Sequence, residues 1–344
     1  MKSSARSASI LLAVLLGFSL LLACAGSPRG QVAGAASGAP GPMAGPAPAP
    51  QAAVVLAVAP VAGRDFSRMH GLARDGEGNL YVDVRPGFVA KLDGRTGMVL
   101  GTYGEAGAEP GRFGSTFGVA LDSKGRIYVL DQKNARLTRI DDISGKGLAW
   151  LDFSGELSSA SLRGLHIDAQ DRIYVGDEAR HRILRMDDLS GKGLVAFGSP
   201  GSGEGEFQGP VGFATDAKGR LYVADADNNR VVRIDGMDGK GWTAFGSFGT
   251  APGQFKSPYF VAVDPEGRIL VADSHGGRIV RMDDMKGKGL ALWSSSDYVK
   301  GRMMAPLGIL CDERGRIWYV DQLNAEIARV DGPDGSGRLV FSLK

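Results

Sequence analysis

The most conspicuous chemical motif in the sequence is the tract Asp-Asp-x-x-Gly-Lys-Gly. It occurs at 141–147, 187–193 and 283–289, with a variant at 235–241. Carboxylates, glycines and a lysine in one short run suggest calcium or phosphate binding. A phosphate loop, however, needs its glycine-rich run between a strand and a helix, and an EF-hand needs more oxygen ligands at its own spacing. We therefore interpret the tract as a hairpin turn. Its lysines would give one face a ring of positive charge that suits an acidic partner: Lys146, Lys192, Lys240 and Lys288.

A second pattern pairs opposite charges. Four aspartates each precede an arginine by five residues, as Asp131–Arg136, Asp177–Arg182, Asp225–Arg230 and Asp273–Arg278. Carboxylate and guanidinium at this spacing can form hydrogen-bonded bridges across a short connection, so we interpret the pairs as structural. In the first repeat, Val84 and Phe88 replace the aspartate and the arginine together. A joint loss is expected if the two side chains are in contact, because either charge alone would be buried without a partner at a high cost in free energy. Asp321 and Glu326 break the rule, and the pattern does not explain them.

These motifs recur because the chain is built from repeats. The phrase Gly-Arg-Leu-Tyr-Val-Ala-Asp at 219–225 returns about every 47 residues, centred on Tyr81, Tyr128, Tyr174, Tyr222, Leu270 and Trp318. Each repeat contains four short stretches typical of strands, here called a to d. In the fourth repeat they are 211–216, 221–225, 230–235 and 242–246. An Asp-x-x-Gly turn follows strand a in five repeats, and Asp171 replaces its glycine in the third.

Six units of four short strands predict an all-β protein, a six-bladed β-propeller of four-stranded antiparallel blades over 53–344. Two further stretches, 53–57 and 339–342, read as strands. One or both should complete the last blade and thereby remove exposed sheet edges.

The repeat resembles the NHL repeat. The likeness is carried by the run Leu-Tyr-Val-Ala-Asp at 221–225, by Asn-Asn-Arg-Val at 228–231 and by Gly-Gln-Phe-Lys-Ser-Pro at 253–258. It covers 53–344 and implies the six-bladed propeller, but it implies little about function, because one fold hosts many functions.

In a propeller the d–a and b–c connections emerge on one face, where the residue that opens strand a lies nearest the central channel. In the six repeats that residue is His70, Phe117, Arg163, Val211, Tyr259 and Leu307. These six differ although their neighbours repeat, and the b–c loops, with Lys133, His181, Asn228 and His275, differ as well. We predict that this variable face binds the ligand.

A propeller enzyme is the alternative. Peptidylglycine amidating lyases are similar in repeat pattern and use three histidines at the channel-facing start of strand a. His70 matches one such position, but the other five lack imidazole, so we expect no three-histidine zinc site. Gluconolactonase-like propellers hold calcium with carboxylates and an asparagine, and none of the six positions is acidic. His166 lies two residues deeper in strand a than the residue that opens the channel, so we expect it to be a core or second-layer residue. We therefore predict no catalytic residue, metal or cofactor, and lyase or lactonase chemistry with a channel metal remains the rival hypothesis.

Charge argues against a nucleic-acid partner. Residues 1–52 contain three basic and no acidic residues, which leaves 37 basic and 38 acidic residues in 53–344. This near-neutral balance lacks the positive footprint of a nucleic-acid-binding protein. RNA binding, which some NHL proteins carry out, also conflicts with export.

The N-terminal 52 residues predict export and anchoring. Residues 1–23 read as a signal peptide, with Lys2 and Arg6 ahead of an apolar run at 10–22. The sequence Leu-Leu-Ala-Cys at 21–24 resembles the bacterial lipobox, which implies a diacylated Cys24. Ordinary signal-peptide cleavage after Ala23 or Ala25, with release of a soluble protein, is the alternative.

Residues 24–52 form an Ala/Gly/Pro-rich segment that we predict to be a disordered tether. The sequence thus predicts a lipoprotein anchored in the membrane of the bacterial cell envelope. We expect its propeller to act as a binding scaffold for an envelope protein, peptide or glycan.

Overall fold

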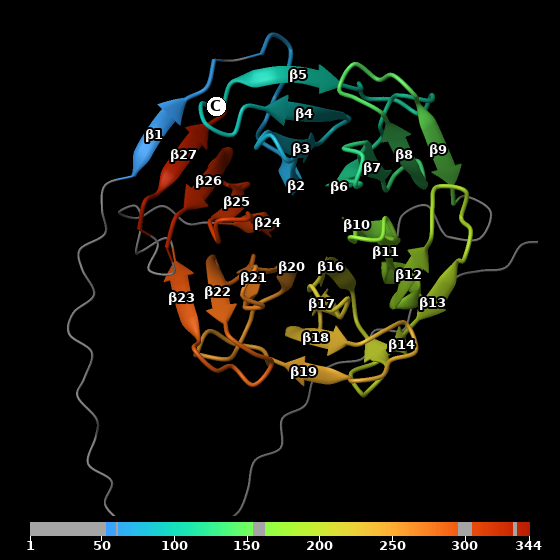
Figure 1. The fold of residues 1–344 in the computed structure, drawn as a ribbon, viewed down its shortest axis with the longest axis vertical. Helices are drawn as coiled ribbons and strands as arrows, with labels where there is room; N and C mark the ends of the chain where they lie inside the picture. Colours follow the sequence, from blue (N-terminus) through green and yellow to red (C-terminus); the bar gives the residue numbers. More distant parts are fainter. Residues whose placement is uncertain (1–52, 60, 154–161, 295–304, 333–335) are drawn as a thin grey trace, which may run out of the picture. The chain divides into compact units, whose positions relative to one another are not determined.

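The computed structural model describes residues 53–59, 61–153, 162–294, 305–332 and 336–344. The signal peptide predicted at 1–23, Cys24 and the tether at 24–52 lie outside the described residues. All of the described residues belong to one compact unit. Six sheets of four or five strands are arranged in a ring around a central axis (Figure 1). A seventh, two-stranded sheet joins β14 (Ser199–Pro200) to β15 (Glu206–Phe207) between blades 3 and 4. The predicted all-β six-bladed propeller is confirmed.

Each blade is an antiparallel sheet whose strands follow one another from the hub to the rim. Blade 1 contains β2 (Met69–Arg74), β3 (Leu80–Val84), β4 (Phe88–Leu92) and β5 (Val99–Tyr103); blade 2 contains β6 (Thr116–Leu121), β7 (Ile127–Asp131), β8 (Arg136–Ile140) and β9 (Ala149–Asp152); blade 3 contains β10 (Leu162–Ile167), β11 (Ile173–Asp177), β12 (Arg182–Met186) and β13 (Val195–Phe197). Blade 4 contains β16 (Pro210–Thr215), β17 (Leu221–Asp225), β18 (Arg230–Ile234) and β19 (Thr243–Phe245); blade 5 contains β20 (Pro258–Val263), β21 (Ile269–Asp273), β22 (Arg278–Met282) and β23 (Ala291–Ser294); blade 6 contains β24 (Pro306–Cys311), β25 (Ile317–Asp321), β26 (Glu326–Val330) and β27 (Leu339–Ser342).

Both predicted closing strands are used. β27 is the fourth strand of blade 6, and β1 (Val54–Ala57) adds a fifth strand outside it. β1 runs parallel to β27, with Val54 opposite Leu339 and Ala57 opposite Ser342. The N-terminal strand is therefore joined to the C-terminal blade, and blade 6 is completed from both ends of the propeller.

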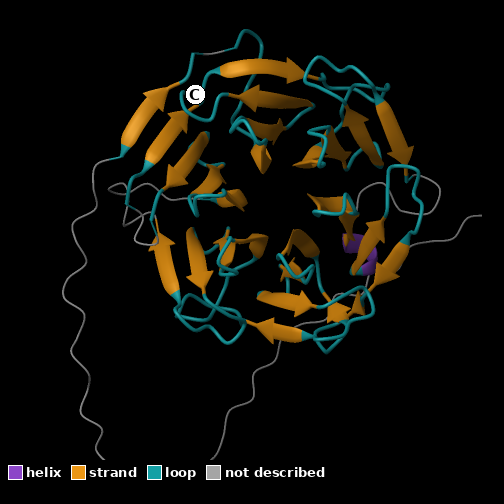
Figure 2. Cartoon of the chain, in the orientation of Figure 1, coloured by secondary structure: helices purple, strands orange, loops and turns teal. Residues whose placement is uncertain are grey.

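Burial explains why the repeated phrase forms strand b. Every residue of β17 is buried, and the same holds for β3, β7, β11, β21 and β25. A strand covered on both faces by neighbouring blades needs a continuous apolar run rather than an alternating one. The outer strands are partly exposed, for example Trp150 in β9 at 46%. Among the described residues the single helical segment is η1 (Glu178–Arg180), a short 3-10 turn (Figure 2).

The predicted turns are confirmed. Asp122 closes the a–b turn by accepting the N–H groups of Lys124 and Arg126 at 3.0 and 2.9 Å, and Gly125 has a φ of +75°. Asp171, which replaces the turn glycine in blade 3, adopts the same left-handed conformation at +61°. Aspartate is one of the few non-glycine residues that tolerates this region.

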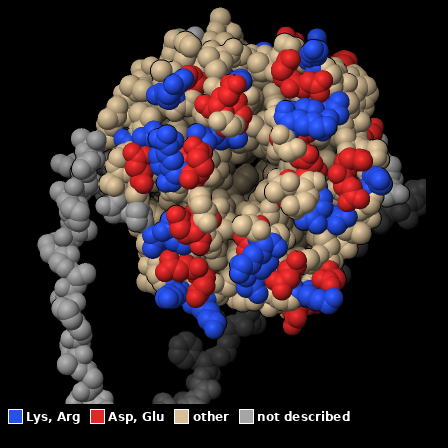
Figure 3. Space-filling model, viewed as in Figure 1, with Lys and Arg blue, Asp and Glu red and all other residues tan. Residues whose placement is uncertain are grey.

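The Asp-Asp-x-x-Gly-Lys-Gly tracts form c–d hairpin turns. The N–H of Asp141 donates to the carbonyl of Lys146 at 2.7 Å, and the equivalent bond recurs in the other tracts. Carboxylates accompany the lysines, as where Lys240 pairs with Asp238 at 2.7 Å. The face of the ring shown in Figure 3 mixes basic and acidic side chains around a central hollow.

The four Asp–Arg pairs are formed, and each joins the end of strand b to the start of strand c. The shortest nitrogen–oxygen distances are 3.4 Å for Arg136–Asp131, 2.9 Å for Arg182–Asp177, and 2.8 Å for both Arg230–Asp225 and Arg278–Asp273. All four aspartates are fully buried. The interpretation of these pairs as structural contacts is confirmed by their geometry.

The arginines do more than pair: three of them hold the d–a loop that enters their own blade. Arg278 donates to the carbonyls of Thr250 and Gln254 at 2.5 and 2.6 Å. Arg230 and Arg136 make equivalent bonds to residues 202–206 and 108–112. Each loop also buries one phenylalanine completely: Phe113, Phe207 and Phe255. We call the Asp–Arg pair together with these carbonyls the loop clamp.

Blades 1 and 6 depart from this arrangement. No d–a loop enters blade 1; instead, residues 61–68 lead into it, and Phe66 packs edge-on against Phe88 at 5.4 Å between ring centroids. Apolar Val84 and Phe88 suit this buried contact. In blade 6, Asp321 still accepts the N–H of Ala305 at 3.2 Å. Glu326 lies 4.0 Å from the buried guanidinium of Arg338, so an arginine from the c–d connection supplies its opposite charge.

Candidate ligand-binding mouth of the central channel

All six residues predicted to open the channel lie at irregularities of the innermost strands. In β2, β6, β10, β16, β20 and β24 the pairing with strand b slips at or beside that residue, as in a β-bulge. A bulge re-aims a side chain and is common beside functional sites. We call these six residues the mouth: His70, Phe117, Arg163, Val211, Tyr259 and Leu307.

Small residues let the inner strands converge at the mouth. Gly164, which follows Arg163, has a φ of +65°, and a Cβ there would collide with the carbonyl of Val211. Gly212 similarly abuts the backbone of Tyr259 and Phe260. At Gly164 only glycine permits both the left-handed backbone and the close approach, and at Gly212 the close approach alone excludes a side chain. The mouth residues are thereby held by a tightly packed hub.

Phe117 is the centre of the mouth. The His70 ring lies 5.3 Å from the Phe117 ring, and the guanidinium groups of Arg85 and Arg163 lie 4.6 and 5.2 Å from its centroid. Val211 is buried in a cluster with Phe117, and Tyr259 packs against that cluster. An arginine over an aromatic face is attracted by the ring quadrupole, so Phe117 organises two cations at one point.

Arg163 has a carboxylate partner. Its Nε lies 2.7 Å from Oε2 of Glu178, the first residue of η1. Burial raises the pKa of Glu178, the Arg163 charge lowers it, and Asp227 raises it again. The sequence patterns did not single out Glu178.

His70 is a buried, neutral member of the mouth. Its Nδ1 lies 3.1 Å from the carbonyl of Arg68, and its Nε2 lies 3.2 Å from the side-chain nitrogen of Gln322. Because a carbonyl only accepts, Nδ1 carries the proton and Nε2 accepts from Gln322. Burial, with added repulsion from Arg85, lowers the pKa of His70 to about 3. His70 therefore positions its neighbours as an uncharged imidazole near neutral pH.

The predicted loop residues have different surroundings. His275 is exposed and lies against Tyr259, with ring centroids 5.7 Å apart, and Lys133 is exposed. His181 accepts the N–H of Gly209 at 3.2 Å. Asn228 donates to Asp225 and to the carbonyl of Gly201, both at 2.8 Å, which makes it part of the loop clamp. Leu307 is buried, at 6% exposure.

Sequence reasoning missed two charged residues beside the mouth, Asp83 and Arg85. Asp83 is fully buried and accepts the N–H of Gly71 at 2.7 Å. Burial raises its pKa from 3.8 to about 6. Arg85 donates from Nε to the carbonyl of Thr116 at 2.8 Å. The sequence does distinguish Asp83, because the other five repeats carry uncharged residues at its position: Leu130, Gly176, Ala224, Ala272 and Val320.

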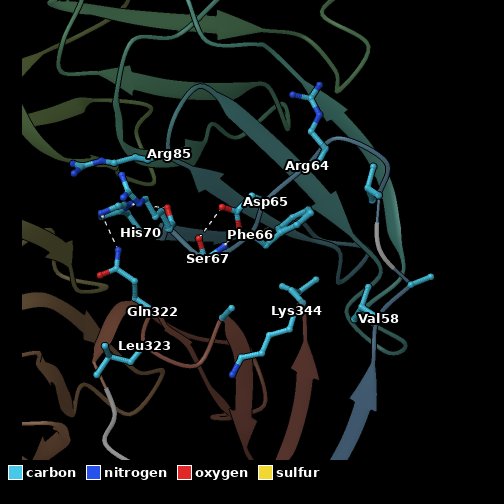
Figure 4. Close-up of a pocket in the computed structure, with 15 residues that line it drawn as sticks. Val58, Arg64, Asp65, Phe66, Ser67, His70, Arg85, Gln322, Leu323 and Lys344 are labelled. Atoms are coloured by element: carbon cyan, nitrogen blue, oxygen red, sulfur yellow. Dashed lines mark hydrogen bonds between the residues drawn. The ribbon is translucent and has the colours of Figure 1, made fainter.

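A cavity of about 930 Å³ adjoins the mouth where blades 1 and 6 meet. His70 belongs to both the mouth and the cavity, and Arg85, beside the mouth, also lines the cavity. Figure 4 shows Gln322 and Leu323 of blade 6 on one side of the cavity and Asp65, Ser67 and His70 on the other. Asp65 is the only lining residue with a carboxylate side chain, whereas three arginines line the cavity: Arg64, Arg68 and Arg85.

The inner strands also line a smaller space of about 440 Å³ in the channel. His166 lines this space, and its Nε2 lies 2.9 Å from Oγ1 of Thr215. Burial lowers the pKa of His166 to about 4, and burial with the nearby Asp264 raises the pKa of the free thiol of Cys311 to about 12. Neither group is charged at neutral pH.

Within the ranges that the structure describes, no three histidine, cysteine, aspartate or glutamate side chains converge as a metal-binding group. Over the same residues, we find no helix with the length and apolar character needed to cross a membrane. The arrangement at the mouth consists of stacked cations, aromatic rings and neutral imidazole. These groups can bind a ligand by charge, stacking and hydrogen bonding.

Comparisons with known proteins agree with the repeat assignment. A sequence model described as the NHL repeat matches residues 207–234. Human NHL repeat-containing protein 3 is 30% identical over 122 residues, which cover 32% of this chain and 35% of the human protein. The chain thus spans about a third of the curated relative that it matches.

Several solved propellers are similar in fold. Virginiamycin B lyase from Staphylococcus aureus is 14% identical with a TM-score of 0.56, covering 79% of this chain and 83% of the lyase. An auxiliary nutrient binding protein from Bacteroides thetaiotaomicron is 14% identical with a TM-score of 0.58, covering 77% and 69%. A chain of a nidogen/laminin complex is 14% identical with a TM-score of 0.54, covering 79% and 97%. At such identities the likeness shows the fold alone.

Proposed function

Because this chain is an NHL-repeat six-bladed β-propeller, we propose that it is a binding scaffold that presents the mouth and the adjoining cavity to a partner. One observation carries the proposal: six dissimilar side chains from six blades converge at bulges on an otherwise repetitive framework. A repeat scaffold with one variable concave surface is the usual form of a binding module. The solved propellers of similar fold include a nutrient binding protein and a chain of a nidogen/laminin complex, which is consistent with this role.

The proposed setting is the bacterial cell envelope, with the propeller anchored through a lipid on Cys24 and its partner an envelope protein, peptide or glycan. The support is the sequence of residues 1–52: an apolar leader, a lipobox-like Leu-Leu-Ala-Cys and a proline-rich spacer. A single acyl chain holds a protein only marginally, whereas two or more hold it firmly. We expect Cys24→Ala to move the protein from the membrane to the soluble fraction, and unchanged membrane association would contradict lipidation at Cys24.

The scaffold proposal is tested by capturing partners from envelope extract with the full chain. We compare wild type with an Arg163→Ala/Tyr259→Ala variant, which removes two mouth residues. A matched control, Arg95→Ala/Trp150→Ala, removes an arginine and an aromatic residue that are exposed away from the mouth. A partner lost only from the mouth variant supports the scaffold. Equal capture by all three proteins contradicts it.

A propeller enzyme of the amidating-lyase or lactonase type is the second candidate, because His70 occupies a lyase-like channel position and a lyase is among the similar structures. Metal analysis of the purified protein separates the two hypotheses. A stoichiometric metal that is lost in His70→Ala would favour the enzyme. Absence of metal from protein purified without chelators would favour the scaffold.

A further inference from the structure

The guanidinium of Arg85 lies where the mouth meets the cavity, and only part of its hydrogen-bonding capacity is used. Nε donates to Thr116, and the planar group stacks over Phe117 at 4.6 Å. Its Nη2 is buried, yet no acceptor for it lies among the described residues. A buried donor without a partner is unfavourable, so this edge of Arg85 is suited to an acceptor from outside the chain.

Arg85 lies among charges of both signs. Burial lowers the pKa of Arg85, the carboxylate of Asp83 raises it, and repulsion from Arg163 and Arg68 lowers it again. The nearby carboxylates are occupied: Asp83 accepts from Gly71, and Glu178 pairs with Arg163. In the cavity, Asp65 accepts from both the backbone and the hydroxyl of Ser67, at 2.8 and 2.9 Å. Three arginines and Lys344 line the cavity against one aspartate, Asp65, so the excess of basic side chains attracts an anionic group.

Apolar side chains share the cavity with the arginines, and its volume exceeds what a single ion needs. Its volume of about 930 Å³ is at the upper end of ordinary ligand pockets. Val61 and Leu343 contribute aliphatic surface, and Leu323 exposes 60% of its surface. Aliphatic walls beside arginines fit a peptide that carries both apolar and acidic side chains. Sugar rings would instead favour exposed aromatic platforms.

We propose that the cavity and mouth bind an acidic peptide segment, with one of its carboxylates held by the free edge of Arg85 and a further one by Arg68. A guanidinium and a carboxylate can form two parallel hydrogen bonds, which adds geometric selectivity to the charge attraction. Phe117 fixes the plane of Arg85, so the donor edge is already oriented before the ligand arrives. The inference rests on the proposed scaffold function and names the class of its ligand.

The test uses acetylated and amidated hexaglutamate as the probe, with hexaglutamine of the same length as its uncharged match. Calorimetric titration of the full chain at low salt should detect hexaglutamate and not hexaglutamine. We expect Arg85→Gln to weaken hexaglutamate binding about tenfold or more, since a charge-assisted hydrogen bond is lost. We expect Arg68→Gln to weaken it about threefold, because Arg68 is exposed and screened.

Two further variants keep the test decisive. Arg95→Gln, an exposed arginine in a c–d turn, should bind hexaglutamate like wild type. Arg85→Lys keeps the charge but loses the planar edge, so its affinity should fall between wild type and Arg85→Gln. Thermal unfolding of each variant shows whether a loss of binding comes from loss of the fold. If Arg85→Gln does not fold, Arg85→Lys is compared with wild type in its place.

The source of the carboxylate is distinguished by trialanine with a free C-terminus and by its amide. Selective binding of the free form, lost in Arg85→Gln, would support the same site with a terminal carboxylate as the ligand group. The inference is wrong if hexaglutamate binds no better than hexaglutamine, if Arg85→Gln binds as well as wild type, or if trigalacturonate binds through Arg85 while both peptides do not. If none of the probes binds but partner capture still depends on Arg163 and Tyr259, the scaffold function stands and only the acidic-peptide inference fails.

Discussion

Blades 5 and 1 use the same repeat positions for different purposes. In blade 5, Asp273 and Arg278 form a loop clamp that fixes residues 250–254. In blade 1 the equivalent residues are Val84 and Phe88, and both are buried in an apolar cluster with Phe66. Blade 1 instead carries its charges one position earlier and one position later than Val84, at Asp83 and Arg85, which are directed to the mouth.

The difference follows from chain connectivity. A clamp holds the d–a loop that enters its own blade, and blade 1 is the one blade that follows no earlier blade in the chain. A buried ion pair without carbonyl partners for the arginine would not recover its desolvation cost. The boundary between blades 6 and 1 is therefore free of the repeat's main structural constraint, and the largest cavity that we describe is found there. The boundary between blades 6 and 1, where the repeat pattern is least regular, therefore has the most suitable geometry for binding a ligand.

Grafting the blade 5 pair into blade 1 should have the largest effect. We expect Val84→Asp/Phe88→Arg to lower the free energy of unfolding by roughly 5 kcal/mol or more, because it removes buried apolar groups and adds ions without the loop carbonyls. Urea denaturation followed by tryptophan fluorescence measures the change. If the Val84→Asp/Phe88→Arg variant is as stable as wild type, the Asp–Arg pair does not depend on carbonyl groups from a d–a loop.

Breaking the clamp in blade 5 should have the next largest effect. Asp273→Ala leaves Arg278 buried and unpaired, and we expect a loss of about 3–5 kcal/mol in the free energy of unfolding. The Asp273→Ala/Arg278→Ala variant should be less destabilised than the sum of the two single variants, since they remove one shared interaction. Additive losses would mean that the two side chains act independently.

Asp83, the charged residue that blade 1 carries next to the position of a clamp aspartate, should make a pH-dependent contribution to stability. Its pKa is raised in the folded state from 3.8 to about 6, so the folded protein binds the proton more tightly than the unfolded chain. This contribution to stability is complete below about pH 4 and is lost as the pH rises to about 6. Asp83→Asn should therefore gain stability relative to wild type across that window, by up to about 1.4 kcal/mol per pH unit.

His70, whose pKa is lowered to about 3, makes the free energy of unfolding rise with pH over part of the same range. This contribution is present in both proteins, so it cancels when the stability of Asp83→Asn is compared with that of wild type. A difference between Asp83→Asn and wild type that stays constant from pH 4 to pH 6 would contradict a raised pKa for Asp83. Chemical denaturation at several pH values supplies the measurement.

The smallest effect is expected from the surface contact between blades 1 and 6. Arg74 Nη1 lies 2.5 Å from Glu313 Oε2, but the Glu313 side chain is 63% exposed. Exposed ion pairs contribute little because solvent and salt screen them. We expect Glu313→Gln to leave the urea midpoint unchanged within error. A clear shift would show that this ion pair helps to close the ring.

Part of the mouth could be predicted from the repeats and part could not. Topology placed His70, Phe117, Arg163, Val211, Tyr259 and Leu307 at the channel because each opens strand a at a fixed offset. Asn228 lies on a b–c loop, which predicted a role in ligand binding, yet it belongs to a clamp, since its amide reaches back to Gly201. Asn134 holds the equivalent position in blade 2 and reaches Gly107 in the same way, so a place on a variable loop does not reveal which neighbour a side chain will contact.

The sequence by itself determined the number of blades, the strands within them, the turn aspartates and the Asp–Arg pairs, because all of these depend on short-range spacing repeated along the chain. Only the tertiary structure decided which residues meet at the closing boundary, where Gln322 reaches His70 across 252 residues. Ring closure brings the two ends of the propeller together, and contacts between its first and last blades have no counterpart in the periodicity of the repeat.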